Sequence, residues 1–182
     1  MDAIEATRAT GLRSTSVLEI GSGVGELARE LARRGARPVT GLDLSAESVA
    51  IARRETAAEG LGDTVRFGVG NGAIEPLEAH DVVVLERVIC CYPRPEELIA
   101  HTSAAAGRVF AFTVPRNEGA HRFLWRAAFW IGNTYHALRR RDFRAYLHDL
   151  DSIDRWLEDE GLVPTQRFSR RGWLHAVYVR GA

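Results

Sequence analysis

A glycine-rich segment near the N-terminus carries the residues best suited to bind a ligand. The segment contains Gly21, Ser22, Gly23 and Gly25. Glycine lets a backbone turn tightly and approach a ligand without a colliding Cβ. The N-terminus of a following helix offers unpaired N–H groups to a carboxylate or phosphate. Glu19, two residues before the first glycine, is suited to accept a hydrogen bond from a cationic amino group.

Three later apolar runs each end in polar residues. These residues are Asp43 with Leu44, Asn71 with Gly72, and Glu86 with Arg87. A carboxylate at position 43 can accept hydrogen bonds from both hydroxyls of a ribose, and Leu44 can lie against an adenine face. Asn71 is placed to form a hydrogen bond with the amino group of the adenine. We expect Glu86 and Arg87 to lie at the far end of the same ligand.

The composition argues against a dinucleotide-dependent oxidoreductase. The G-x-G-x-x-G fingerprint requires glycine where this chain has Glu26, and an acid there would face a pyrophosphate unfavourably. All 24 basic residues are arginine, so no lysine is present for a P-loop, a Schiff base or a Tyr-Lys catalytic pair. A nicotinamide-dependent oxidoreductase is therefore the weaker alternative.

Short β-branched runs alternate with longer amphipathic stretches, which is typical of an α/β fold with a parallel sheet. We expect strands at 16–20, 38–42, 65–69, 81–85, 109–114, 165–169 and 173–179. We expect helices at 2–12, 24–34, 45–59, 95–105 and 152–160. The tight connection between the last two strands predicts an antiparallel hairpin. Residues 1–182 are thus predicted to form a single domain with a doubly wound, mostly parallel seven-stranded sheet that ends in this hairpin.

From residue 16 to residue 180, the pattern resembles the class I S-adenosylmethionine-dependent methyltransferases. Their E/D-x-G-x-G-x-G loop is similar to Glu19–Gly25, their ribose-binding acid to Asp43, and their terminal hairpin to the last two strands. Asn71 stands where many members have aspartate. The resemblance implies S-adenosylmethionine as the cofactor, no metal, and transfer of a methyl group to a small-molecule acceptor.

Two segments have a narrower likeness within that family. Residues 88–93 and 143–148 resemble parts of the magnesium-protoporphyrin O-methyltransferases, which methylate a propionate carboxylate. This chain has Cys91 where those enzymes have a histidine before Tyr-Pro. We expect Cys91, Tyr92 and Arg144 to contact the acceptor. O-methylation of an acidic or aromatic compound is expected, with a porphyrin and a smaller acidic or phenolic acceptor both open.

Residues 116–148 differ in composition from the rest of the chain. They hold seven of the fifteen aromatic residues and seven arginines against two acids, a local charge of 7 − 2 = +5. One interpretation is an amphipathic helix on the sheet edge with solvated arginines. The other is a substrate-facing cap that offers aromatic walls and cations to an anionic ligand.

The need for a catalytic base depends on the acceptor. A carboxylate is already ionised at neutral pH, whereas a phenol or alcohol must lose a proton. The candidates for a base or an orienting group are Tyr92, His121, Tyr146 and His148. Arg144 is suited to clamp an acceptor carboxylate through two hydrogen bonds.

Length and charge narrow the remaining function classes. The chain has 182 residues, 24 basic and 24 acidic, so its net charge is zero. This balance argues against a main role in binding nucleic acid or anionic membranes. The sequence contains no run of 18 apolar residues, so no membrane-spanning helix is predicted. The first residues do not resemble a secretory signal, and we therefore expect a cytoplasmic protein. A non-catalytic or partner-dependent S-adenosylmethionine-binding module remains the main alternative to an enzyme.

Overall fold

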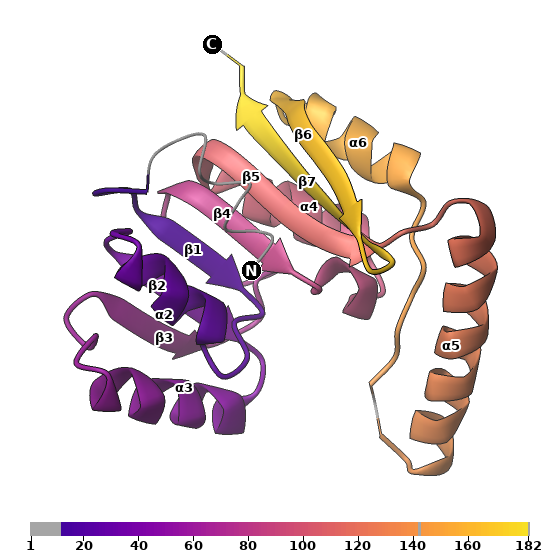
Figure 1. The fold of residues 1–182 in the computed structure, drawn as a ribbon, viewed down its shortest axis with the longest axis horizontal. Coiled ribbons are helices and arrows are strands. Elements are labelled where there is room, and N and C mark those ends of the chain that lie inside the picture. The colour runs from indigo at the N-terminus through magenta and orange to yellow at the C-terminus, as the bar shows by residue number, and fades with distance from the viewer. Residues whose placement is uncertain (1–11, 142, 182) are drawn as a thin grey trace.

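A seven-stranded sheet forms the centre of the protein (Figure 1). The computed structural model describes residues 12–141 and 143–181. The strands are β1 (Val17–Ile20), β2 (Val39–Asp43), β3 (Val65–Val69), β4 (His80–Glu86), β5 (Ala106–Pro115), β6 (Leu162–Arg170) and β7 (Trp173–Arg180). Their order is β3-β2-β1-β4-β5-β7-β6, parallel from β3 to β5, with β7 antiparallel to both β5 and β6. The predicted parallel sheet with a terminal antiparallel hairpin is confirmed.

Helices cover both faces of this sheet. They are α2 (Glu26–Arg33), α3 (Ala46–Ala58), α4 (Pro95–Ala104), α5 (Gly119–Leu138) and α6 (Leu150–Asp159), and a short 3-10 helix, η2 (Ile89–Cys91), follows β4. The predicted helices starting near 24, 45, 95 and 152 are found within two residues of these bounds. Most of the helix expected at 2–12 lies outside the described residues.

The two faces have separate hydrophobic cores because side chains alternate along each strand. Leu18 and Ile20 of β1 lie in the core that α4 and α6 complete. Val17 lies on the opposite face, in the core shared with α2 and α3. Burial on both faces explains why the central strands read as nearly continuous apolar runs.

Local capping residues set several helix ends. The Ser45 hydroxyl accepts a hydrogen bond from the Ser48 N–H at 3.1 Å, and the Asp149 carboxylate accepts one from the Ser152 N–H at 3.0 Å. Both residues are N-caps, and both have the short polar side chain that this position prefers. Gly35 and Gly60, which follow α2 and α3, have positive φ angles of 102° and 69°.

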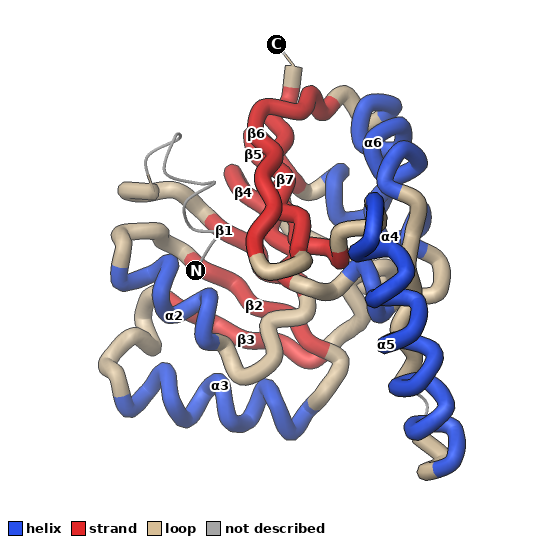
Figure 2. The backbone as a smooth tube through the Cα atoms, turned by 45° about the vertical axis from the view of Figure 1, so that its right-hand side comes forward, coloured by secondary structure: helices blue, strands red, loops and turns tan. Residues whose placement is uncertain are grey.

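Helix α5 stands outside this layered arrangement, beside the β6–β7 hairpin (Figures 1 and 2). It has 20 residues, and none of them is buried. The chain then returns through an extended segment, of which residues 143–149 are called the strap. Within the described ranges, no helix is both long and apolar enough to cross a membrane.

The packing around the glycine loop predicts a measurable difference between two glycines. Gly25 and Gly60 both have positive φ, but a Cβ at Gly25 would lie 2.4 Å from Phe67 Cζ, whereas a Cβ at Gly60 would meet nothing within 4 Å. Gly60→Ala should lower the free energy of unfolding by about 1 kcal/mol through backbone strain alone. Gly25→Ala should lower it by about 2–4 kcal/mol, because overpacking adds about 1–3 kcal/mol. Urea denaturation measures both, and equal losses would contradict the packing described here.

Candidate functional site

The carboxyl ends of the parallel strands surround a cavity of about 430 Å³, called here the strand-end cavity. It lies beside β1, which has β2 on one side and β4 on the other. At this point the chain stops adding strands on one side of β1 and begins to add them on the other. Open α/β sheets bind ligands at such a point. Ten of the residues singled out from the sequence line it: Gly21, Asp43, Leu44, Asn71, Gly72, Glu86, Arg87, Cys91, Tyr92 and Arg144.

The glycine loop is open at its middle and closely packed at its ends. A Cβ at Gly21 would lie 2.3 Å from Val88 Cγ2, and one at Gly25 would overlap Phe67. A Cβ at Gly23 would meet nothing within 4 Å, so this backbone faces open space. Gly21 and Gly25 therefore allow the loop to pack, and Gly23 leaves room for a ligand.

Asp43 connects the glycine loop to the end of β2. Its Oδ2 accepts a hydrogen bond from the Gly23 N–H at 2.7 Å, and its Oδ1 accepts one from the Ser45 N–H at 2.8 Å. A carboxylate has about four acceptor positions, so each oxygen keeps one for a further donor. The geometry thus suits a ligand with two neighbouring hydroxyl groups.

Glu19 is the most unusual ionisable group in the site. It is only 2% exposed, and burial raises its pKa from 4.5 to about 8, with the nearby charges of Glu86 and Asp43 adding to the rise. A hydrogen bond from the Ala28 backbone and the charge of Arg29 act in the opposite direction.

One oxygen of Glu19 is buried without a hydrogen-bond donor beside it in the described part of the chain. Its Oε2 and the Ser22 Oγ are buried without a hydrogen-bond partner among the described residues. Both residues line a second cavity of about 770 Å³, which shares Gly21, Glu86 and Arg87 with the strand-end cavity. Buried acceptors of this kind normally have partners. A ligand ammonium group would supply one.

Arg87 lies where the cavities meet. Its φ of 60° is in the left-handed region, which is unusual for a residue with a side chain. Its guanidinium stacks over the Trp173 ring at 4.7 Å, and its Nε lies 3.4 Å from Glu86 Oε1. The other Glu86 oxygen, Oε2, accepts a hydrogen bond from Thr113 at 2.5 Å. These contacts hold one cation and one anion beside the strand-end cavity.

A third cavity, of about 290 Å³, adjoins the strand-end cavity and is called the aromatic cavity. Its rings come from α5, the strap and β7: Trp125, Phe129, His136, Phe143 and Trp173. It shares Arg87, Cys91 and Phe143 with the strand-end cavity. A polar cavity and a ring-lined cavity therefore meet at one point.

Reciprocal hydrogen bonds hold the walls of the aromatic cavity in place. Asn133 on α5 donates from Nδ2 to the Ala145 carbonyl at 2.8 Å and accepts from the Ala145 N–H at 2.8 Å. Trp125 Nε1 donates to the Gly172 carbonyl at 2.9 Å. These bonds attach α5 to the strap and to the hairpin.

Two of the four candidate bases lie in the strap instead of lining the cavities. His148 Nε2 donates to the Tyr92 carbonyl at 3.0 Å, and burial lowers the pKa of this imidazole. The Tyr146 ring stacks on His148 at 5.7 Å, and its N–H donates to the Cys90 carbonyl at 2.7 Å. Both residues attach the strap to η2. Tyr92 lines the strand-end cavity.

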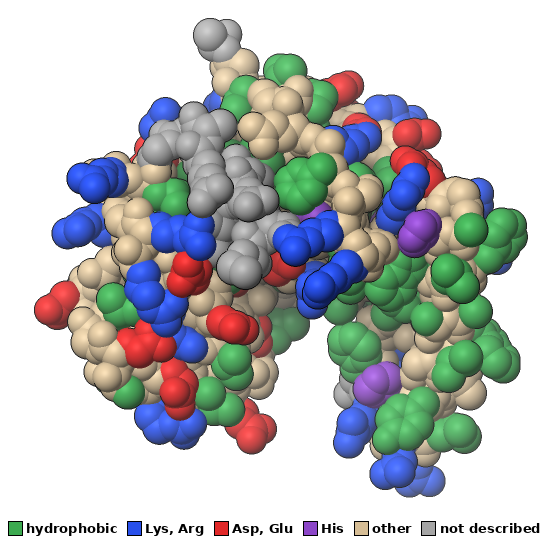
Figure 3. Space-filling model, in the orientation of Figure 1, with side chains coloured by type: hydrophobic (Ala, Val, Ile, Leu, Met, Phe, Trp, Pro, Cys, Tyr) green, Lys and Arg blue, Asp and Glu red, His purple; other side chains and the backbone are tan. Residues whose placement is uncertain are grey.

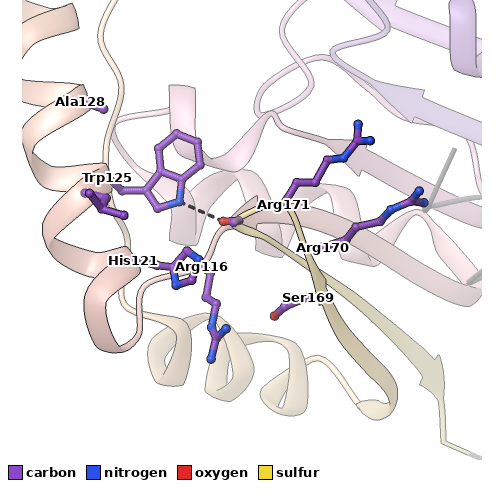
Figure 4. A pocket seen from close by; sticks show the side chains of 9 residues that line it. Arg116, His121, Trp125, Ala128, Ser169, Arg170 and Arg171 are labelled. Atoms are coloured by element: carbon purple, nitrogen blue, oxygen red, sulfur yellow. Dashed lines mark hydrogen bonds between the residues drawn. The ribbon is translucent and has the colours of Figure 1, made fainter.

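His121 lies in a separate cavity beside the hairpin turn (Figure 4). The cavity measures about 460 Å³, and its walls include Trp125 and Gly172. In Figure 4 the side chains of Arg170 and Arg171 extend away from His121, so the charged groups do not converge on one point. The described residues contain no group of three or more His, Cys, Asp or Glu side chains arranged to hold a metal ion.

Sequence reasoning missed three residues that the structure brings to the site. Val88 packs against Gly21, Trp173 stacks on Arg87, and His136 lines the aromatic cavity with a buried Nδ1 that has no partner among the described residues. The only signal for His136 was the aromatic content of residues 116–148. Nothing in the sequence indicated that Trp173 faces Arg87.

The known proteins that this chain resembles in sequence are methyltransferases. Residues 17–108, about half of the chain, match the family model described as "Methyltransferase domain". A ubiquinone biosynthesis O-methyltransferase of Klebsiella pneumoniae is 35% identical over 119 residues, covering 63% of this chain and 49% of the relative. One of Proteus mirabilis is 35% identical over 130 residues, covering 69% and 53%. The chain spans about half the length of these curated relatives.

Solved structures share the fold over nearly the whole chain. Magnesium protoporphyrin IX methyltransferase from Synechocystis, with bound SAH, has a TM-score of 0.79 at 23% identity, covering 99% of this chain and 80% of that one. An O-methyltransferase family protein from Burkholderia thailandensis has a TM-score of 0.79 at 19% identity, covering 100% and 55%.

The raised pKa of Glu19 makes stability depend on pH in a specific direction. The folded state keeps this proton up to about pH 8, whereas the unfolded chain releases it near 4.5. The contribution of Glu19 is therefore fully present below about pH 4.5 and is lost as pH rises through 8, by up to about 1.4 kcal/mol per pH unit.

Glu19→Gln, which cannot ionise, should match the wild type at pH 4.5 and become the more stable protein as pH rises to 9. Denaturant titrations of both proteins across this range measure the difference. A difference that does not change with pH would show that Glu19 is ionised in the folded protein.

Proposed function

The chain belongs to the methyltransferase-domain family, and from that premise we propose that it transfers a methyl group from S-adenosylmethionine to an oxygen of a small aromatic acceptor. One observation carries the proposal. The strand-end cavity and the second cavity beside it together have the polar groups that a nucleoside with an amino-acid tail requires. The strand-end cavity also meets the ring-lined aromatic cavity at Arg87, Cys91 and Phe143. A donor and a flat acceptor are thereby given adjoining places.

Three groups in the strand-end cavity would hold the nucleoside. The free acceptor positions of Asp43 suit the two ribose hydroxyls, and the exposed Leu44 side chain suits the adenine face. Asn71 Oδ1 already accepts the Ala73 N–H at 3.0 Å. This oxygen keeps one acceptor position for the adenine amino group, and the amide Nδ2 is left to donate to a ring nitrogen of the base.

Glu19 would hold the amino-acid tail. Its buried, unpartnered Oε2 fits an α-ammonium, and the open space beside Gly23 leaves room for the rest of the tail. Because an ammonium ion beside a carboxylate favours its ionised form, Glu19 would lose its proton when this tail binds. The charge that is unfavourable in the free protein would then be neutralised.

When bound, S-adenosylmethionine supplies a methyl group on a sulfonium, which an oxygen displaces in line. The chain must therefore align the acceptor and exclude water. The guanidinium of Arg87, held over Trp173, would attract the acceptor's anionic oxygen to the junction of the two cavities. For a phenolic acceptor, His136 Nδ1 joins Tyr92 as a candidate proton acceptor, because it is buried in the aromatic cavity without a described partner.

Cavity size favours a single-ring acceptor. We infer that residues 116–148 form a substrate-facing cap, since α5 and the strap supply most of the rings of the aromatic cavity. About 290 Å³ is at the low end of the ~300–1,000 Å³ typical of small-molecule sites. That volume suits one substituted ring better than a tetrapyrrole. The relatives named for ubiquinone biosynthesis support the same choice.

The assignment of the donor site can be tested at Asp43. Asp43→Ala should weaken S-adenosylmethionine binding by about 1–3 kcal/mol, the scale of a charged hydrogen-bond acceptor. The matched control is Asp63→Ala, which removes an exposed carboxylate outside the cavities and should leave affinity unchanged. Isothermal titration calorimetry measures both, with NADH as the competing ligand. Unchanged affinity in Asp43→Ala, or tighter binding of NADH, would refute the proposed donor site.

The acceptor site can be tested with neighbouring residues on opposite sides of α5. Phe129 lines the aromatic cavity, whereas Trp130 faces outward. With a soluble catechol or hydroxybenzoate acceptor and radiolabelled donor, Phe129→Ala should raise the acceptor KM about tenfold or more through lost ring contacts. It should not change donor affinity, and Trp130→Ala should change neither value.

Equal effects of the two variants would place the acceptor elsewhere. Donor binding without turnover on any acceptor would instead support the alternative of a non-catalytic binding module.

A further inference from the structure

The side of α5 that faces away from the protein is apolar along its whole length. Phe123, Trp130, Ile131 and Leu138 are 74, 71, 61 and 80% exposed. Their spacing of seven or eight residues places them on one face of the helix. Figure 3 has the orientation of Figure 1, in which α5 is the helix at the right. Apolar side chains follow the outer edge of this helix along its length. This set of four residues is called the outer face.

The outer face is not needed to complete the protein's own core. The opposite side of α5 carries Trp125, Phe129 and His136, which line the aromatic cavity. Helix α5 is thus apolar on two sides, and within residues 12–141 and 143–181 only one of them meets other parts of the protein. Exposed apolar surface of this extent marks an interaction site.

Arginines lie along one edge and at the C-terminal end of the outer face. Helix α5 contains no Asp or Glu, and Glu118 is its N-cap. Arg126 lies within one helical turn of Phe123 and Trp130, Arg122 precedes Phe123, and Arg139, Arg140 and Arg141 follow the last turn of α5. Cationic side chains lie at the end of α5 that these arginines occupy in Figure 3. The neutral net charge of the chain does not cancel this field, because charges beyond about 10 Å are screened at physiological salt.

We propose that the outer face of α5 docks on an anionic lipid bilayer, with the helix lying in the plane of the interface. Aromatic and aliphatic side chains would enter the boundary between headgroups and acyl chains, and the arginines would contact lipid phosphates. The charge pattern opposes a second copy of this chain as the partner. An antiparallel pair of α5 helices would bring Arg139, Arg140 and Arg141 close to Arg122 of the other copy.

Docking in this orientation would place helix α5 between the bilayer and the aromatic cavity, because the rings of the cavity project from the opposite side of the helix. The docking proposal does not depend on catalysis, and its test requires no turnover.

The test is sedimentation of the full chain with vesicles. Vesicles of equal parts phosphatidylglycerol and phosphatidylcholine should bind the protein, and vesicles of phosphatidylcholine alone should bind it about tenfold more weakly. Raising salt to about 0.5 M should weaken binding to the anionic vesicles. The double variant Phe123→Ser/Trp130→Ser should lose binding at least about tenfold through lost apolar burial.

Two further variants separate the contributions. Arg139→Gln/Arg140→Gln/Arg141→Gln should lose the preference for anionic vesicles and keep the outer face. Val163→Ser removes an exposed apolar side chain on β6 and should bind as the wild type does. Unchanged S-adenosylmethionine binding by calorimetry shows that each variant is folded.

Three outcomes would overturn the proposal. The first is equal binding by wild type and Phe123→Ser/Trp130→Ser. The second is no binding to either kind of vesicle. The third is a concentration-dependent dimer in light scattering that the same double variant abolishes while vesicles bind nothing, which would assign the outer face to a second copy.

Discussion

The hydrogen bond from the Gly23 amide to the Asp43 carboxylate is the interaction on which the site depends. It joins the loop after β1 to the end of β2, and both strands are buried in the middle of a parallel sheet. A charge-assisted bond of this kind is short and directional. Because it holds Gly23 at φ 52° with open space beside it, the loop stays clear of side chains. The remaining polar groups are arranged around that opening.

Glu19 illustrates how a binding site can be prepared at the expense of the free protein's stability. A carboxyl group that is fully buried, next to Glu86 and Asp43, is held in its neutral form. Most buried polar atoms in folded proteins have partners, and Glu19 Oε2 does not have one among the described residues. In the function proposed above, a cationic ligand group would remove this deficit, and selectivity for a positively charged tail would follow from burial and not from an exposed ion pair.

Helix α5 has a different role from the helices that cover the sheet. Its inner side completes a cavity whose other walls come from the strap and from Trp173 on β7, and Asn133 and Trp125 hold these parts together. The same helix therefore lies between the aromatic cavity and the outer face. Its inner side carries rings of the cavity, and its outer side carries the apolar outer face next to arginines, so residues 116–148 combine aromatic and cationic side chains.

The sequence alone determined the backbone features that depend on local chemistry. Short β-branched runs predicted the strands, and the longer amphipathic stretches between them predicted the helices. The order of the strand ends placed Asp43 and Asn71 beside the glycine loop. Only the tertiary structure decided which imidazole faces which cavity: His136 lines the aromatic cavity, and His148 holds the strap. The reason is physical. The direction of a side chain on α5 or the strap follows from contacts with elements distant in the chain, and no local pattern records those contacts.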